Sequence, residues 1–232
     1  MIPKIIHWCW LSETYPELVS KCLQTWKKFC QDYEIVRWDL KKSDLANTPK
    51  WCQIAYENRL YAFCADFIRA RALYEYGGVY LDSDVCLRVK NPFKEYEGDN
   101  IWIPFEDVDK LETHYYNGVK YTTGKNINPV FMGAVPHHPF FKEVLDRYWT
   151  LDDEYALKAS ECKSYTPIAP AIFSKEMEKY GMVYINKEQY LKDGIHLLTN
   201  EKFDHLGCVT DKSKMKAIHL CTHTWVKGNI KY

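Results

Sequence analysis

The sequence lacks the features that would tie it to a membrane span or to nucleic acid. No apolar run approaches the roughly 20 residues that a membrane-spanning helix needs. The 31 Lys and Arg residues balance the 31 Asp and Glu residues, so no overall charge attracts nucleic acid, and none is expected as a partner. The chain also contains no internal repeat, low-complexity tract or linker. We therefore expect a single domain over residues 1–232.

The nine cysteines contain no C-x-x-C pair, and no secretory signal precedes them. A disulfide framework is therefore not indicated, and reduced, buried thiols are the expectation. Together with the missing apolar run, this predicts a cytoplasmic protein that is at most peripheral to the inner face of a membrane.

The residues that are present predict an α/β domain. Hydrophobic residues make up 47% of the 232 residues, enough for a substantial core. Helices are expected from residue 16, before Gly77, and over 139–149 and 171–180; strands are expected over 4–8, 34–38, 79–81 and 101–105. The segment 91–133 reads as less regular. Strands that alternate with helices indicate a mainly parallel central sheet flanked by helices.

The most informative stretch is residues 65–84, A-D-F-I-R-A-R-A-L-Y-E-Y-G-G-V-Y-L-D-S-D. It indicates a helix that ends at a glycine turn and a short apolar strand that ends in two carboxylates. If Asp82 and Asp84 continue the extended strand, their side chains point to the same side and Ser83 points away. Two such carboxylates suit Mn²⁺ or Mg²⁺, which add water and phosphate oxygens to their coordination. The pattern predicts a metal site that binds a diphosphate.

The helix before the glycines is apolar around most of its circumference. Two stripes of apolar residues recur at helical spacing, namely Leu60, Phe63, Phe67, Ala70 and Tyr74, and Tyr61, Cys64, Ile68 and Ala72. Asp66 and Arg69 share the remaining face, either as a surface ion pair worth a few tenths of a kcal/mol or as the wall of a polar cleft. Because charges without partners are costly to bury, we favour the cleft.

The run A-D-x-x-R-x-x-x-L-x-x-x-G-G-x-Y-x-D-x-D resembles the signature of the DXD-containing sugar transferases, glycosyltransferase family 32. This family includes yeast mannosyltransferases and many bacterial polysaccharide-assembly enzymes, and a similar run occurs in the glucosylating domains of the large clostridial cytotoxins. Further matches lie in residues 2–10, 26–28 and 33–39, and looser ones in 132–139 and 217–225. A bare D-x-D is common by chance, whereas the twenty-residue run is specific.

The resemblance implies a GT-A-like single domain. Residues 1–90 would form the nucleotide-sugar-binding half, and residues 91–232 the acceptor half with a carboxy-terminal closing segment. The donor would lie at the carboxyl ends of the strands. The implied reaction is metal-dependent hexose transfer with retention of anomeric configuration. Since no nucleophile is obvious, front-face attack by an acceptor hydroxyl is the hypothesis. We expect UDP-hexose as donor and a glycan or lipid-linked oligosaccharide of bacterial surface polysaccharide synthesis as acceptor.

The same resemblance implies roles for individual residues. Asp82 and Asp84 would be catalytic and would ligate Mn²⁺ or Mg²⁺ with His219 as third ligand, or His223 in its place. The donor-binding residues would be Trp10, Asp66, Arg69, Tyr80, Asp82, Asn128, Trp225 and Lys227. Trp10 would stack on the nucleotide base, although it also fits an ordinary core position, and His219 also fits an ordinary structural histidine.

Three other functions fit parts of the pattern. A GDP-mannose-dependent mannosyltransferase would share every motif. A haloacid-dehalogenase-like phosphohydrolase would use Asp82 as nucleophile, with Asp152 and Asp153 as its later acidic pair. That pattern, however, normally opens its domain and explains neither Asp66 nor Arg69. A non-catalytic nucleotide-sugar-binding module is the third alternative, and the complete acidic pair argues against it.

Overall fold

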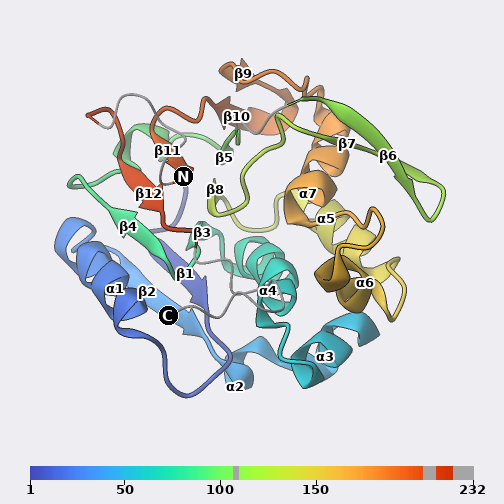
Figure 1. Cartoon of the computed structure of the whole chain (residues 1–232). Coiled ribbons are helices and arrows are strands. Elements are labelled where there is room, and N and C mark those ends of the chain that lie inside the picture. The colour runs from blue at the N-terminus through green and yellow to red at the C-terminus, as the bar shows by residue number, and fades with distance from the viewer. Residues whose placement is uncertain (107–109, 206–212, 222–232) are drawn as a thin grey trace.

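A seven-stranded sheet forms the centre of the computed structural model, which describes residues 1–106, 110–205 and 213–221. Its strand order is β2-β1-β3-β8-β5-β10-β9 (Figure 1). The strands are β1 (Ile5–Cys9), β2 (Glu34–Trp38), β3 (Gly78–Leu81), β5 (Ile101–Pro104), β8 (Phe131–Ala134), β9 (Gln189–Tyr190) and β10 (Ile195–Leu198). Strands β8 and β9 run opposite to the others. The prediction of a mainly parallel sheet is confirmed.

Different elements cover the two faces of this sheet (Figure 1). The helices are α1 (Glu17–Phe29), α2 (Leu40–Ser43), α3 (Lys50–Glu57), α4 (Tyr61–Tyr76), α5 (Pro139–Trp149), α6 (Tyr155–Glu161) and α7 (Ala169–Met177). One face packs against α3 to α7. The other packs against α1 and a smaller sheet of β4 (Val85–Leu87), β11 (Phe203–His205) and β12 (Ala217–His219). No helix in the described ranges combines the length and apolar character needed to cross a bilayer.

Alternation along the strands explains why both faces are covered. In β3, Tyr80 joins the core beneath α4, whereas Val79 and Leu81 join the core beneath α1. Successive strand residues point to opposite faces, so a strand that is apolar at every position needs helices or a second sheet on both sides. The large sheet is therefore the middle layer of a three-layer domain, in agreement with the prediction of a central sheet flanked by helices.

The local sequence located several elements closely. The ranges predicted for the second strand and for the helix over 139–149 match β2 and α5. The first strand begins at Ile5, one residue later than predicted, and the last predicted helix begins two residues earlier, at Ala169. Gly77 ends α4 as expected: its φ of 64° is one that residues with a Cβ rarely adopt.

The prediction of an irregular segment over 91–133 is incomplete. This segment contains a hairpin of β6 (Glu112–Tyr116) and β7 (Val119–Thr123). Asn117 and Gly118 form its two-residue loop, with φ values of 48° and 75°. Positive φ at both positions is the requirement of a type I′ turn, for which Asn-Gly is a preferred pair. The signal was present in the sequence and was missed.

His7 in β1 connects two buried parts of the fold. Its Nδ1 accepts a hydrogen bond from Trp38 Nε1 at 3.1 Å, and its Nε2 lies 2.9 Å from the carbonyl oxygen of Gly77. The carbonyl can only accept, so Nε2 carries the proton and the ring is neutral. Burial lowers the pKa of His7 to about 4, and Lys42 acts in the same direction. His7 is therefore a structural residue that needs to remain uncharged.

We expect His7 to make folding stability fall in mild acid. The unfolded chain takes up a proton at His7 near pH 6.5, whereas the folded chain does so only near pH 4. The stabilisation is complete above pH 6.5 and is lost as the pH falls toward 4. Between pH 7 and 4, wild type should lose about 3 kcal/mol more unfolding free energy than His7→Gln, measured by urea unfolding. Equal losses in the two proteins would contradict this assignment, since other groups titrate alike in both.

Candidate active site

The carboxyl ends of neighbouring strands place several predicted site residues at one edge of the sheet. Strands β1 and β3 are parallel neighbours, so Trp10, which follows β1, and Asp82, which follows β3, lie at the same edge. The Asp82 backbone N–H donates to the Val130 carbonyl at 3.2 Å. The Asn128 N–H donates to the carbonyl of Pro104 in β5 at 2.7 Å. The segment that leads into β8 therefore connects the D-x-D to the end of β5.

Arg69 joins helix α4 to the D-x-D. Its Nη2 lies 2.8 Å from Asp66 Oδ1 and 3.1 Å from Asp82 Oδ1. Its Nη1 donates to the Pro129 carbonyl at 2.9 Å, and its guanidinium lies 5.0 Å from the centre of the Tyr80 ring. Arg69 is only 5% exposed, so the alternative of a surface ion pair is wrong. Arg69 is instead the buried centre of a network with Asp66 and the first D-x-D carboxylate, whose side chains are partly exposed.

Two carboxylates share this single guanidinium, and the pKa of each is raised. Burial raises the pKa of Asp66 to about 7, with Arg69 acting in the opposite direction. Burial also raises the pKa of Asp82, and Arg69 and His219 oppose the rise. Burial alone would lower the pKa of Arg69, but Asp82 and Asp66 raise it. Arg69 is therefore a permanent cation, while Asp66 exchanges its proton near neutral pH, as groups at functional sites often do.

The D-x-D is a turn, so the prediction that it extends the strand is wrong. Strand β3 ends at Leu81 and β4 begins at Val85, whose N–H donates to the Asp82 carbonyl at 3.0 Å. The expected alternation of side chains does not apply to a turn. Asp82 contacts Arg69, whereas Asp84, which is 6% exposed, lies 3.1 Å from His219 Nε2. The two carboxylates have different partners but remain close enough for Asp84 to raise the pKa of Asp82.

Strand pairing brings His219 to the D-x-D from far along the chain. Strand β12 runs antiparallel to β4 with His219 opposite Val85, and the Leu220 N–H donates to the Asp84 carbonyl at 3.1 Å. Burial alone would lower the pKa of His219, but its hydrogen bonds to Asp84 and Cys221 raise it to about 10. His219 is therefore an imidazolium in the protein described here, and it has to lose a proton before it can ligate a cation.

Trp10 and Tyr80 differ in how much of each side chain solvent can reach. Trp10 is half-buried, its indole N–H donates to the Thr14 carbonyl at 2.8 Å, and its ring meets Tyr15 edge-on at 6.2 Å. Tyr80 is 1% exposed and packs under the Arg69 guanidinium. The exposed part of the Trp10 ring remains compatible with base stacking, whereas Tyr80 contacts Arg69 with its ring and hydrogen-bonds to Asp82, which lowers the pKa of that carboxylate.

Only one of the two polar atoms of the Asn128 side chain has a hydrogen-bond partner among the described residues. Its Oδ1 accepts from the Val130 N–H at 3.2 Å. Its Nδ2 is buried and is among the side-chain atoms of the described residues that have no hydrogen-bond partner. An unsatisfied buried amide costs about 1–3 kcal/mol, so such an atom in a natural protein calls for an explanation.

Residues 16–109 match a family described as "Glycosyltransferase sugar-binding region containing DXD motif". These residues include Asp66, Arg69, Asp82 and Asp84. This part of the chain is therefore similar to a glycosyltransferase sugar-binding region. The resemblance to the DXD-containing sugar transferases is thereby confirmed.

Relatives of this sugar-binding region occur in fungi and viruses. Inositol phosphoceramide mannosyltransferase 3 of Schizosaccharomyces pombe is 30% identical over 148 residues, which cover 62% of this chain and 36% of that protein. Uncharacterized glycosyltransferase L373 of Acanthamoeba polyphaga mimivirus is 29% identical over 147 residues, which cover 61% of this chain and 53% of that protein. The chain thus spans only about a third to a half of the length of these relatives.

A solved structure supports the predicted fold. It is a glycosyltransferase involved in the glycosylation of the major capsid of PBCV-1, with a TM-score of 0.51 and 12% sequence identity. The match covers 94% of this chain and 93% of that chain. The sugar-binding region therefore belongs to a GT-A-type α/β fold.

The donor atoms around the D-x-D suit a divalent cation. Carboxylate oxygens and an imidazole nitrogen are ligands that Mn²⁺ accepts. Asp84 Oδ1 and His219 Nε2 lie 3.1 Å from each other. Asp82 lies nearby but turns toward Arg69. Among the described residues, no group of three or more His, Cys, Asp or Glu side chains has the arrangement of a metal site.

The remaining predicted residues His223, Trp225 and Lys227 lie outside the described residues, as does most of the predicted closing segment.

Glu106 is an acidic residue near the site that sequence reasoning missed. It lies two residues beyond the carboxyl end of β5, and its N–H donates to the Asn126 carbonyl at 2.8 Å. Burial raises the pKa of Glu106 to about 8, Asp204 raises it further, and His219 opposes the rise. The available signal was an apolar strand ending in a carboxylate, the same signal that drew attention to the D-x-D.

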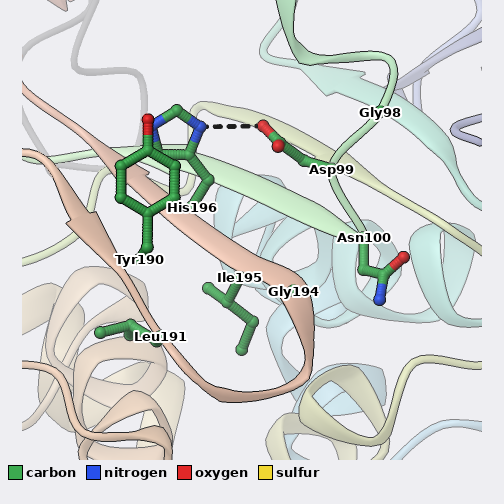
Figure 2. Close-up of a pocket in the computed structure, with 8 residues that line it drawn as sticks. All are labelled: Gly98, Asp99, Asn100, Tyr190, Leu191, Gly194, Ile195 and His196. Atoms are coloured by element: carbon green, nitrogen blue, oxygen red, sulfur yellow. Dashed lines mark hydrogen bonds and ion pairs between the residues drawn. The ribbon is translucent and has the colours of Figure 1, made fainter.

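Figure 2 shows a pocket in a different part of the sheet. Its volume is about 180 Å³, and it is lined by residues 98–100, 190–191 and 194–196. Asn100 precedes β5 and Gly194 precedes β10, so the pocket lies at the amino ends of these strands. Strands β3 and β5 run in the same direction, since both are antiparallel to β8. The pocket is therefore at the opposite edge of the sheet from the D-x-D.

Proposed function

We propose that this protein is a metal-dependent, retaining hexosyltransferase that moves a hexose from UDP-hexose to a glycan or lipid-linked oligosaccharide. The observation that carries the proposal is the buried network in which Arg69 holds Asp66 and Asp82 while Asp84 pairs with His219. Buried carboxylates are costly unless they are paired, so their accumulation at one sheet edge needs a functional reason. A diphosphate held through a cation at the carboxyl ends of the strands supplies that reason.

The charge that develops during the reaction determines what the site has to do. Cleavage of the bond between the anomeric carbon and the diphosphate leaves negative charge on the nucleoside diphosphate. When bound, Mn²⁺ or Mg²⁺ supplies Lewis-acid stabilisation of this charge, and in this proposal Asp82, Asp84 and His219 hold the ion. To hold the ion, His219 would first have to lose a ring proton, because only the neutral ring has a lone pair to share. Metal affinity should therefore rise with pH.

The neighbouring residues position the donor sugar. Arg69 fixes Asp66 and Asp82 through their Oδ1 atoms, and the proposal assigns the Asp66 Oδ2 atom to a sugar hydroxyl and leaves the Asp82 Oδ2 atom for the ion. The Asn128 Nδ2 atom, which is buried and lacks a partner among the described residues, would donate to a sugar hydroxyl or a phosphate oxygen. Trp10 would stack on the nucleotide base. The Asn128 amide would then be fully hydrogen-bonded only when the donor is bound.

GDP-mannose is a second candidate donor, because the fission-yeast relative is named as a mannosyltransferase. The phosphohydrolase alternative is weaker. It would need Asp82 as a nucleophile, yet the Asp82 carboxylate is held against Arg69 and linked through it to Asp66. A phosphohydrolase motif gives no role to that link.

A panel of nucleotide sugars tests the proposal directly. We expect Mn²⁺-dependent release of an intact nucleoside diphosphate from one donor at least about tenfold faster than from the others, since side-chain contacts to the sugar hydroxyls discriminate between sugars. UDP-glucose, UDP-galactose, UDP-N-acetylglucosamine and GDP-mannose form the panel, and liquid chromatography separates the products. Chelation with EDTA should stop the release, and added Mn²⁺ should restore it.

Two results would count against this function. Inorganic phosphate as the first product would favour a phosphohydrolase, as would trapping of an aspartyl adduct analogue by beryllium fluoride. Binding of a nucleotide sugar without any turnover, with or without acceptor glycans, would favour a non-catalytic binding module.

A further inference from the structure

A pair of cysteines lies beside the D-x-D and has no role in the proposed reaction. Cys22 of α1 and Cys86 of β4 are 64 residues apart in sequence, and their Sγ atoms are 3.2 Å apart. Cys22 is fully buried, whereas Cys86 is partly exposed. Two thiols in direct contact, one of them reachable from solvent, are arranged as an oxidisable pair.

Hydrogen bonds on either side of Cys86 hold α1 and β4 in this register. Trp26 Nε1 donates to the Val85 carbonyl at 2.8 Å. The Leu87 N–H donates to Thr25 Oγ1 at 3.0 Å. Both contacts join residues of α1 to the immediate neighbours of Cys86, and Trp26 lies one helical turn beyond Cys22. The short distance between the two sulfurs is therefore a consequence of how the helix packs on the strand.

We infer that Cys22 and Cys86 are a modification site at which an oxidant of the peroxide class forms a disulfide. The more exposed Cys86 thiol attacks one peroxide oxygen, which gives a sulfenic acid and releases one water when the oxidant is hydrogen peroxide. The Cys22 thiol then displaces the hydroxyl group as a second water, and the S–S bond forms. The pair loses two electrons and two protons in total, and the peroxide is reduced.

The cross-link would fix the strand that follows the D-x-D. Asp84 lies two residues before Cys86, and β4 pairs with β12 so that Cys86 lies opposite Ile218, next to His219. Tying β4 to α1 would therefore restrain both partners of the Asp84–His219 pair. Reduced thiols remain the expectation for the protein without oxidant. The inference does not depend on the proposed sugar transfer.

Peptide mapping of the oxidised protein tests the inference. The fully reduced protein is treated with a small excess of hydrogen peroxide, its remaining thiols are blocked with N-ethylmaleimide, and a non-reducing digest is examined by mass spectrometry. We expect a Cys22–Cys86 linked peptide that is lighter than the sum of its parts by two hydrogens. The midpoint of thermal unfolding should rise by roughly 10 °C, because a loop of this length is closed in the unfolded chain. Dithiothreitol should reverse both changes.

Variants separate this pair from the other cysteines. Cys86→Ser should abolish the linked peptide and the thermal shift, whereas Cys30→Ser, at the end of the same helix, should retain both. If Cys86→Ser does not fold, the presence or absence of the Cys22–Cys86 linked peptide in the wild-type protein still tests the inference. A sulfinic acid on Cys86 without any linked peptide, or a disulfide from Cys86 to a different cysteine, would overturn the inference. Full recovery of Cys22 and Cys86 as maleimide-blocked thiols after peroxide treatment would also overturn the inference.

Discussion

We expect Asp84→Asn to lower sugar transfer by about 10³-fold while the chain remains folded. A divalent ion contributes several kcal/mol to leaving-group stabilisation, and each 1.36 kcal/mol corresponds to a tenfold change in rate. Asparagine keeps the shape of Asp84 and can still accept from His219, but it removes the charge that makes the carboxylate a strong ligand. The measurements are turnover as a function of Mn²⁺ concentration and the circular dichroism spectrum of each protein.

Asp153→Asn provides the matched control. Asp153 is an exposed residue after α5, so the same change of charge there should leave turnover within about twofold of wild type, as for most surface substitutions. Wild-type turnover in a folded Asp84→Asn protein would remove the D-x-D from the proposed mechanism. Equal losses in both variants would point to an effect of net charge instead.

The largest effect on stability should come from Arg69→Met. Arg69 is 5% exposed and is the shared partner of Asp66 and Asp82. Removing one member of a buried charge network leaves the others uncompensated and typically costs about 3–5 kcal/mol. For a chain of this size, that cost lowers the midpoint of thermal unfolding by roughly 10 °C. Differential scanning calorimetry at neutral pH measures the change.

A second substitution tests whether the loss arises from the unpaired carboxylates. Asp66 has a pKa of about 7 even beside Arg69, so in the Arg69→Met protein it has to take up a proton on folding at neutral pH; replacing Asp66 with Asn removes that cost and should recover part of the lost stability. Lys21→Met is the control, because the Glu17–Lys21 pair is exposed and contributes about 0–1 kcal/mol. If Arg69→Met costs no more than Lys21→Met, the network is not a buried charge cluster that stabilises the fold.

The elements that could be predicted are those whose determinants lie within one short segment. The 139–149 helix has Pro139 in its first turn and a single apolar stripe, and its predicted ends are those of α5. Gly77 ended α4 because a residue with positive φ is needed at that point. Each of these features depends on neighbouring residues alone, so local propensity and spacing were sufficient.

Within the sugar-binding region, the sequence identified Asp66, Arg69, Asp82 and Asp84 but not their contacts. The expected strand geometry of the D-x-D was wrong because the chain turns between β3 and β4, and no residue type in D-S-D demands that turn. Asn128 was chosen on a loose match, and its buried, unpartnered Nδ2 emerged only from its packing. Glu106 was missed because its proximity to His219 depends on how the three-stranded sheet packs against the seven-stranded sheet.

The sequence by itself determined the α/β class, the approximate positions of several strands and helices, and the membership of residues 65–84 in a sugar-binding motif. Tertiary structure alone decided that Asp66 and Asp82 share Arg69, that Asp84 contacts His219, and that Cys22 contacts Cys86. The physical reason is the same in each case. These contacts join residues on different elements, and the register between elements is set by hydrogen bonds and core packing distributed over the whole domain, which no single segment encodes.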